Sequence, residues 1–451
     1  MEIINSFPGY EYVYYESDKK FHNIFRDTDV GHGGYIYAEP GMYGNIALLD
    51  IRSMHPTSAV CLNAFGDYTK NFEDILNARI AIKGRDYESA RKMFDGRLAK
   101  YLDDESTAQD LSQALKIAIN SVYGLTSAKF TNPFRDPRNN NNIVALRGAL
   151  FMRTLQDEVM RRGYKVASIR TDSIKIPDAT PDIIKFCMDF AEKYGYVFEH
   201  EATYDRMCLV NASAYIAKYA TSEKCEKLYG YAPKDNKKHG GKWTATAAQF
   251  QVPYVFKKLF SKEPITFDDM CETKEVKKGA LYLDKNEYLP DVSEYEKELS
   301  KMEDKYKKGL LSDTTFETSC AELNDKIAEG HCYHFVGKVG QFCPIKPGCG
   351  GALLYRYQDG KYNAATGSTG YRWLETAMVI ELQKENDVDE TYYIELVDKA
   401  VESISQYGDF SWFVSDDPYI PEPKEPVYEW MNIPEDAPPE GLPWDDYART
   451  N

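Results

Sequence analysis

The chain has 451 residues, 43% of them hydrophobic, so it is long enough for two or three packed units. No apolar run approaches the roughly 20 residues of a membrane helix, and the start lacks the basic flank and apolar block of a signal peptide. The net charge of −16 argues against a nucleic-acid binder. However, residues 381–451 hold 19 acids and 4 bases, so the body is near neutral and local basic patches can still meet phosphates.

The nine cysteines are scattered without a C-x-x-C pair. An odd, unpatterned set suits a reducing compartment, so we expect a cytoplasmic protein whose thiols are mostly buried.

The first predicted elements are a strand and two helices. Residues 1–45 are aromatic and rich in glycine, and the apolar run 45–51 predicts a buried strand. Helical periodicity with many charges marks 71–102, and after a polar break 107–125 resumes the helix. Two helices joined by a short polar turn should lie antiparallel.

The rest of the chain mixes both kinds of element. A loop is predicted at 131–142, followed by a long amphipathic helix at 142–162 with Gly163 as its cap. Two β-prone runs within 165–176 predict a hairpin. Further elements are a mostly helical, charged stretch at 255–330, a small sheet at 345–372 and a Pro-rich acidic tail from Ser415.

Two carboxylates stand at the ends of predicted strands. Asp50 lies in LLDIRSMHPTS (48–58), where a buried strand meets a turn broken by Pro, and Asp172 lies in the hairpin turn of SIRTDSI (168–174). Each has an ordinary explanation when taken singly. Asp50 could cap the next turn, and Asp172 could satisfy the backbone of its own hairpin.

A third segment, KIAINSVYG (116–124), lies on the second predicted helix. Lys116, Asn120 and Tyr123 fall at i, i+4 and i+7 and share one helix face. A solvated face explains the lysine, but it explains less well a tyrosine and Gly124 in register with it.

In this order and spacing, the three segments resemble the polymerase motifs of the family B (α-like) DNA polymerases, written DxxSLYPS, KxxxNSxYG and YxDTDS. The second motif matches at every fixed position. The positions kept in the first and third are Asp50, Ser53, Pro56, Thr57 (for Ser), Thr171, Asp172 and Ser173.

Further segments extend the resemblance over about residues 30–415. GHGGYIY (31–37) resembles the YxGG segment that precedes the palm, and 198–215 resembles the approach to the KxY motif. Residues 241–261 and 360–375 are similar to thumb segments of phage members of the family.

The resemblance implies an α+β fold of the right-hand polymerase type, with an antiparallel-sheet palm, two-helix fingers and a mixed helical and β thumb. The implied divisions are an N-terminal segment (1–45), a palm in two parts (46–70 and 131–254), fingers (71–130), a thumb (255–415) and the acidic tail (416–451).

The implied reaction is template-directed addition of deoxynucleotides to a primer 3′-hydroxyl with release of pyrophosphate. Two Mg²⁺ ions roughly 3.5–4 Å apart can clamp the attacking and leaving oxygens, and Mg²⁺ prefers carboxylate ligands. Asp50 and Asp172 are the expected catalytic metal ligands. The carbonyl oxygen of Ile51 is implied as a further ligand, and Mn²⁺ is the alternative ion.

The incoming triphosphate needs cations. Arg79 and Lys83, at i and i+4, resemble the basic pair of the first fingers helix and would gather the phosphates together with Lys116. The implied nucleotide-binding set is Ser53, Met54, His55, Arg79, Lys83, Lys116 and Asn120. Tyr123 and Gly124 are implied as the floor under the new base pair. The implied DNA contacts are Gly33, Gly34, Thr171, Tyr215 and Lys218.

Three residues depart from the family pattern. His55 stands where the family usually has the Tyr that excludes a 2′-hydroxyl, and we expect it to keep that gate. Arg170 replaces the first Asp of DTD, the more dispensable of the two, and Ser213 replaces the Lys of KxY.

The expected partners are primer–template DNA and dNTPs, with no membrane. The family usually carries an exonuclease before the palm, and 1–45 is too short to hold one. We therefore expect either no proofreading or a separate exonuclease subunit or replisome protein. The intervals between the motifs leave no room for the insertions of protein-primed members, so an ordinary primer is expected. The phage-like segments imply viral replication in a bacterial cytoplasm.

Two other functions stay open. The first is an inactive relic that grips primer–template DNA, as Arg170 and Ser213 would suggest. The second is a reverse transcriptase, whose usual adjacent Asp-Asp turn is replaced here by Thr171-Asp172-Ser173. Primer extension with Mg²⁺ distinguishes polymerase from relic.

Overall fold

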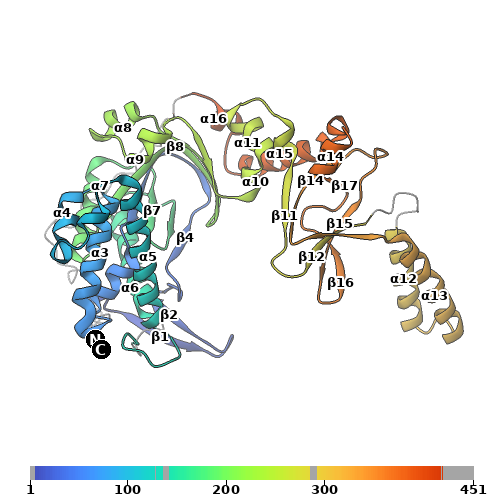
Figure 1. The fold of residues 1–451 in the computed structure, drawn as a ribbon, viewed down its shortest axis with the longest axis horizontal. Coiled ribbons are helices and arrows are strands. Elements are labelled where there is room, and N and C mark those ends of the chain that lie inside the picture. Colours follow the sequence, from blue (N-terminus) through green and yellow to red (C-terminus); the bar gives the residue numbers. More distant parts are fainter. Residues whose placement is uncertain (1–5, 127, 136–141, 285–291, 418, 420–451) are drawn as a thin grey trace. The chain divides into compact units, whose positions relative to one another are not determined.

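The computed structural model describes residues 6–126, 128–135, 142–284, 292–417 and 419 (Figure 1). The chain divides into two compact units, unit 1 (1–246 and 407–451) and unit 2 (247–406). Helices accompany sheets whose strand pairs are antiparallel throughout the described ranges, so the fold is α+β. No helix in these ranges is long and apolar enough to cross a membrane.

A seven-stranded sheet forms the centre of unit 1 as far as the structure describes it, with the order β10-β9-β8-β5-β7-β6-β4. Its strands are β4 (Ile36–Ala38), β5 (Gly41–Ile51), β6 (Ser168–Arg170), β7 (Ser173–Ile176), β8 (Phe198–Asn211), β9 (Ala214–Tyr219) and β10 (Trp243–Ala245). A smaller sheet joins β1 (Tyr10–Tyr15), β2 (Lys20–Phe25) and β3 (Thr28–Asp29).

The apolar run predicted as a strand is the middle of the sheet. β5 lies between β7 and β8. Ala47, Leu49 and Ile51 belong to the main core of unit 1, whereas Ile46 and Leu48 belong to a second cluster on the other face. Because successive side chains of a strand point to opposite faces, a strand buried on both sides needs such a continuous apolar run. Asp50 alternates with Leu49, so it lies on the face of Leu48.

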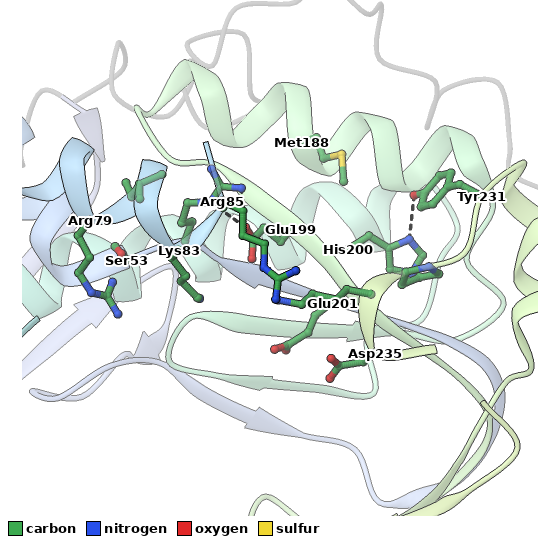
Figure 2. Close-up of a pocket in the computed structure, with 15 residues that line it drawn as sticks. Ser53, Arg79, Lys83, Arg85, Met188, Glu199, His200, Glu201, Tyr231 and Asp235 are labelled. Carbon is green, nitrogen blue, oxygen red and sulfur yellow. Dashed lines mark hydrogen bonds and ion pairs between the residues drawn. The ribbon is translucent and has the colours of Figure 1, made fainter. Parts of the chain in front are cut away.

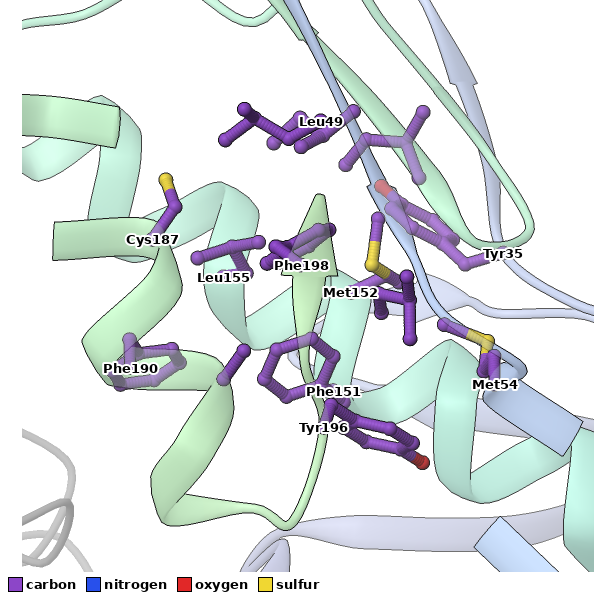
Figure 3. Close-up of a cluster of buried hydrophobic side chains, with 14 of the residues drawn as sticks. Tyr35, Leu49, Met54, Phe151, Met152, Leu155, Cys187, Phe190, Tyr196 and Phe198 are labelled. Carbon is purple, nitrogen blue, oxygen red and sulfur yellow. The ribbon is translucent and has the colours of Figure 1, made fainter. Parts of the chain in front are cut away.

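Helices cover the face of the seven-stranded sheet that carries Ala47, Leu49 and Ile51. The helices of unit 1 are α2 (Met54–Cys61), α3 (Thr69–Lys83), α4 (Tyr87–Lys92), α5 (Glu105–Thr126), α6 (Ile143–Arg161), α7 (Pro181–Lys193), α8 (Ser222–Tyr229), α9 (Lys234–His239) and α16 (Phe410–Val414). Figure 3 shows the core that α6 and α7 build against the sheet, with Phe151 of α6 beside Phe198 of β8. Gly163 follows α6 with a φ of 77°, as its predicted capping role requires.

The charged helical stretch at 71–102 is less continuous than predicted. α3 ends at Lys83, and the Asp86 carboxylate then caps α4 by accepting from the Ser89 amide at 3.1 Å. The remainder forms the 3₁₀ turns η2 (Met93–Gly96) and η3 (Ala99–Tyr101), and a further turn, η1 (Gly66–Tyr68), precedes α3. α3 and α5 pack against each other around a small core of Ile82, Ala90, Leu102 and Ala108.

Unit 2 holds two sheets. A three-stranded one has the order β11-β14-β17 and a four-stranded one the order β13-β12-β15-β16, within the described residues. The strands are β11 (Glu272–Glu275), β12 (Ala280–Asp284), β13 (Tyr333–Gly337), β14 (Val339–Ile345), β15 (Leu353–Gln358), β16 (Lys361–Ala364) and β17 (Arg372–Glu375). The helices are α10 (Ala248–Gln251), α11 (Pro253–Phe256), the π-turn η5 (Lys257–Ser261), η6 (Phe267–Met270), α12 (Val292–Lys307), α13 (Asp313–Gly330), α14 (Thr376–Glu381), η7 (Glu385–Asp387) and α15 (Glu390–Ser405).

Two strands interrupt the stretch at 255–330 that was predicted as mostly helical. They are β11 and β12, and in β12 Leu281 and Leu283 alternate with Tyr282, which is the two-residue period of a half-buried strand. Most of the predicted acidic tail (418 and 420–451) lies outside the described residues. The palm, fingers and thumb divisions stay predictions.

Candidate active site

The sheet brings the two predicted catalytic carboxylates together. Asp50 is the penultimate residue of β5 and stands opposite Ser173, the first residue of β7. Asp172 precedes Ser173 in the β6–β7 turn, and its carbonyl oxygen accepts from the Ile51 amide at 2.8 Å. Main-chain pairing, rather than a side-chain contact, therefore fixes the two acids as neighbours.

A glycine loop holds the turn of Asp172. Thr171 has a φ of 56°, in the left-handed region, and its amide donates to the Tyr35 carbonyl at 3.0 Å. Gly34 has a φ of 136°, and a Cβ built on it would lie 2.9 Å from Cγ2 of Thr171. Only glycine fits so close to the turn. Gly33 has open space around its Cα.

The surroundings of Asp50 are strongly acidic. Burial raises the pKa of its carboxyl from 3.8 to about 7, and the charge of Asp172 acts in the same direction. Glu201 and Glu199 add smaller effects of the same sign, and Lys83 opposes them. Glu199 stands opposite Asp50 on β8, and Arg52 Nε donates to it at 2.7 Å. Burial is thus the largest cause of the raised pKa, and the repulsion between Asp50 and Asp172 adds to it.

This donor set fits a divalent cation. Mg²⁺ is commonly held by one or two carboxylates, with waters and substrate phosphates completing its ligands. Asp50 and Asp172 provide that pair, and a cation between them would relieve the repulsion that raises the pKa of Asp50. In the described part of the chain, no group of three or more His, Cys, Asp or Glu residues is arranged to hold a metal ion.

The first turn of α2 adjoins the carboxylates. Ser53 precedes the helix with a φ of 59°, and its side chain makes no capping hydrogen bond. The Met54 and His55 amides have no acceptor among the described residues, and the first turn carries no acid. A helix start of this kind favours an anion such as a phosphate. The Met54 side chain is buried against Gly148, so only its main chain could face a nucleotide.

A cavity of about 1000 Å³ opens beside this turn, between α3, β8 and the segment leading into α9 (Figure 2). Ser53, Arg79 and Lys83 line it, whereas Asp50 and Asp172 do not. Nε of Arg79 is buried and has no hydrogen-bond partner among the described residues. A buried guanidinium N–H without an acceptor is costly, and an anionic ligand in the cavity would supply one.

His55 and Tyr123 form a pair of rings near the turn. Their centroids lie 6.0 Å apart, with planes 20° from parallel. Burial lowers the pKa of His55, and the charge of Asp172 partly opposes this, so Asp172 acts on His55 as well as on Asp50. Nε2 of His55 is buried without a partner among the described residues. The Tyr123 hydroxyl donates to Oδ1 of Asn142 at 3.0 Å.

The other predicted residues do not line the cavity. Lys116, Asn120 and Gly124 are exposed on α5 and do not line it. Lys218, predicted to contact DNA, has its amine 2.7 Å from the Asp416 carboxylate. Tyr215 is half-buried and lies under the Lys175 amine, which is 5.0 Å from its ring centroid.

Sequence analysis missed several residues near the site. Lys175 is only 6% exposed, on the face of the sheet that carries Asp50, and burial lowers its pKa to about 8. A lysine between two isoleucines of a predicted strand was a usable signal. His200 forms part of the cavity wall, with Nδ1 2.8 Å from the Tyr231 hydroxyl. Glu201 lies where the β5–β8 register shifts, and nothing local marks such a bulge.

No family model matches this chain, and no curated protein matches it. Among solved structures, it is similar to the family B DNA polymerase from the hyperthermophilic archaeon Pyrobaculum calidifontis, with a TM-score of 0.41 and 14% sequence identity. The match covers 82% of this chain and 46% of that one, so the chain spans about half the length of that polymerase. The α+β fold thus resembles that structure distantly, and nothing about activity follows from so distant a likeness.

Proposed function

We propose that this chain is a template-directed DNA polymerase, which adds deoxynucleotides to a primer 3′-hydroxyl and releases pyrophosphate. One observation carries the proposal: β5 and the β6–β7 turn place Asp50 and Asp172 side by side, next to a helix start and a cavity lined by Arg79 and Lys83. Phosphoryl transfer depends on positioning and on neutralising charge, and this arrangement offers both.

Each part of the site has a role in the proposal. Asp50 and Asp172 would hold Mg²⁺, with the Ile51 carbonyl as a further oxygen. When bound, two Mg²⁺ ions would neutralise phosphate charge and activate the primer hydroxyl. The Ser53 hydroxyl and the first amides of α2 would bind the outer phosphates.

The fingers residues would complete the nucleotide site. Arg79 would bind phosphate oxygens through its fork of donors, while Lys83 and Lys116 would act as point charges. The exposed face of α5 with Asn120 and Gly124, together with the His55–Tyr123 ring pair, would lie against the new base pair. Closure of these helices on a correct pair would select the nucleotide. The phage-like segments named above support a role in phage DNA replication within the same proposal.

Primer extension tests the proposal directly. A labelled primer on a longer template, with Mg²⁺ and single dNTPs, should be extended by the complementary nucleotide only. Asp50→Asn and Asp172→Asn should each reduce the rate at least about 100-fold, because each removes a charge needed in the transition state. Their affinities for primer–template DNA should stay within about threefold of wild type.

Glu192→Gln is a matched control, since Glu192 is an exposed acid of α7 that does not line the cavity. It should extend the primer like wild type. A wild-type chain that binds primer–template tightly but adds no nucleotide would be the relic, and the polymerase proposal would fail. Equal rates for wild type and Asp50→Asn would remove the carboxylate pair from the mechanism.

A further inference from the structure

The four-stranded sheet of unit 2 has two unlike faces. Leu281 and Leu283 of β12 and Leu354 of β15 lie in the core of the unit. Tyr282, between the two leucines, points to the opposite face because side chains alternate along a strand. That opposite face is lined with aromatic rings.

Six rings share this face and are called the aromatic platform here. Tyr282 stands opposite Phe335 on β13 and Tyr355 on β15, and Tyr357 stands opposite Tyr362 on β16. Residues directly opposite each other lie on the same face. The members of the aromatic platform are Tyr282, Tyr333, Phe335, Tyr355, Tyr357 and Tyr362.

The rings contact one another across four strands. Tyr333 and Tyr362 are stacked with their centroids 3.6 Å apart, and the Tyr282 ring lies 5.2 Å from that of Tyr362. Phe335 is 61% exposed, while Tyr282 and Tyr362 are half-buried. The ring of Phe335 is therefore open to a ligand, and the half-buried tyrosines beside it extend the aromatic surface.

Lysines gather at one end of the platform. Lys277 and Lys278 precede β12, and the Lys338 carbonyl accepts from the Val276 amide at 2.9 Å, which places Lys338 beside them. Lys361 begins β16, where it pairs with Gln358 of the β15–β16 hairpin. Among the described residues, none of these four lysines has an ion-pair partner.

We propose that the aromatic platform binds single-stranded DNA, with bases stacked on Phe335 and its neighbours and phosphates held by the lysines. Aromatic surfaces beside unpaired cations match a nucleic-acid strand, which carries both bases and phosphates. An apolar protein partner would offer no negative charge to the lysines. The preference for DNA over RNA rests on the proposed polymerase function. Stacking itself does not distinguish the two.

Ring-specific variants of Phe335 test the stacking. Fluorescence anisotropy with a labelled oligo-dT of about 20 nucleotides, in EDTA and without dNTPs, gives the affinity of the full chain. Phe335→Ala and Phe335→Leu should each weaken binding about tenfold, whereas Phe335→Tyr should stay within about threefold, because stacking needs a ring and not only an apolar side chain. Circular dichroism and melting curves should match wild type, since Phe335 is largely exposed.

The salt dependence of DNA affinity tests the contribution of the platform's lysines separately. Lys338→Gln should reduce the slope of log affinity against log salt by about 0.7, the value for one phosphate contact to a single strand. Lys301→Gln is the control, because Lys301 is an exposed lysine of α12 that belongs neither to the platform nor to its four lysines. It should leave the slope unchanged.

Photocrosslinking locates the contact without a variant. Wild type irradiated with oligo-dT that carries 5-bromodeoxyuridine should be labelled in peptides that contain Tyr282, Phe335 or Tyr362. The proposal would be overturned if labelling were confined to unit 1. It would also be overturned if Phe335→Ala or Phe335→Leu bound oligo-dT with the affinity of wild type. Tighter binding of oligo-U than of oligo-dT would overturn the choice of DNA.

The two proposals can fail separately. A chain that shows Phe335-dependent binding but no primer extension would remove the polymerase function and keep the platform. Primer extension without Phe335-dependent binding would support the polymerase function and remove the platform.

Discussion

The amide of Ile51 donates to the carbonyl oxygen of Asp172 at 2.8 Å, which joins the end of β5 to the β6–β7 turn. This bond belongs to the main chain, so it does not depend on either carboxylate. Substitution of Asp50 or Asp172 by asparagine should therefore leave the turn in place. The site can then be tested by removal of charge alone.

Asp50→Asn should stabilise the metal-free protein at pH 8. The folded-state pKa of Asp50, about 7, lies above its ordinary 3.8, so the stabilisation from protonation is complete below about pH 4 and is lost as pH rises through 7. At pH 8 the buried charge then costs on the order of 1–2 kcal/mol, allowing for solvent screening. In EDTA the variant should melt a few degrees higher than wild type.

Magnesium should remove this difference. Mg²⁺ should raise the melting temperature of wild type at pH 8 and have little effect on Asp50→Asn, because a ligand that binds only the folded state stabilises it. Calorimetry with and without Mg²⁺ gives both values, and Glu192→Gln should behave as wild type. An equal rise in all three proteins would mean that the cation binds elsewhere.

Much of this site could be predicted because its signals are local. The apolar run that ends at Asp50, the two-residue hairpin turn and the i, i+4 spacing of Arg79 and Lys83 each lie within one short segment. The structure places the first two in β5 and the β6–β7 turn.

The remaining features come from pairing between distant segments. Glu199 faces Asp50 because β8 pairs with β5, about 150 residues away, and no local pattern encodes that register. The burial of Met54 follows from the lack of a side chain at Gly148 on a different helix. The platform on β12 was missed because its alternation is short and lies within a highly charged stretch.

Arg79 should determine nucleotide affinity. Its Nε is buried without an acceptor among the described residues, so a bound triphosphate should satisfy it. Steady-state primer extension with Arg79→Ala should show a KM for dNTP about 10–100-fold higher, the range for a charged hydrogen bond of about 1.5–3 kcal/mol. Arg79→Lys should recover part of the loss, because lysine keeps the charge without the fork of donors. Arg97→Ala, which removes an exposed arginine near α4, should change little. A loss of affinity for primer–template DNA at an unchanged KM for dNTP would mean that Arg79 contacts the DNA and not the nucleotide.

His55 should exclude ribonucleotides. Its ring is held near that of Tyr123 and is kept neutral by burial, so it presents a flat, uncharged edge beside Asp172. His55→Ala should lower the ratio of kcat/KM for dNTP to that for the matching rNTP by about tenfold or more. His55→Tyr, which introduces the tyrosine of the motif that this segment resembles, should raise the ratio. Equal, high ribonucleotide use by wild type and His55→Ala would end the gate hypothesis.

Gly34→Ala should disturb the turn of Asp172. The new methyl group would meet Cγ2 of Thr171 at 2.9 Å, and the φ of 136° disfavours any side chain. The rate of primer extension should fall clearly, whereas the melting temperature should change little. Gly309→Ala is the matched control, since Gly309 also has a positive φ but no atom within 4 Å of a built Cβ. If both variants lose activity equally, the loss is not specific to the Thr171 contact.

His200 should make the protein sensitive to mild acid. Burial lowers the pKa of its imidazole to about 4, while its Nε2 lies 2.9 Å from the Thr203 hydroxyl. A lowered folded-state pKa means that stability is intact above the unfolded value of about 6.5 and falls as pH drops toward 4, because only the unfolded chain takes up the proton. The loss attributable to His200 should reach about 2 kcal/mol at pH 5.

His200→Gln keeps a hydrogen-bonding side chain but cannot titrate, so its stability should fall less between pH 7 and pH 5 than that of wild type. Denaturant unfolding at the two pH values measures the difference. His22→Gln is the control: His22 has its pKa raised, chiefly by a hydrogen bond to Asp29, so it cannot produce an acid-induced loss of this sign. Parallel losses in wild type and His200→Gln would show that protonation elsewhere governs the acid response.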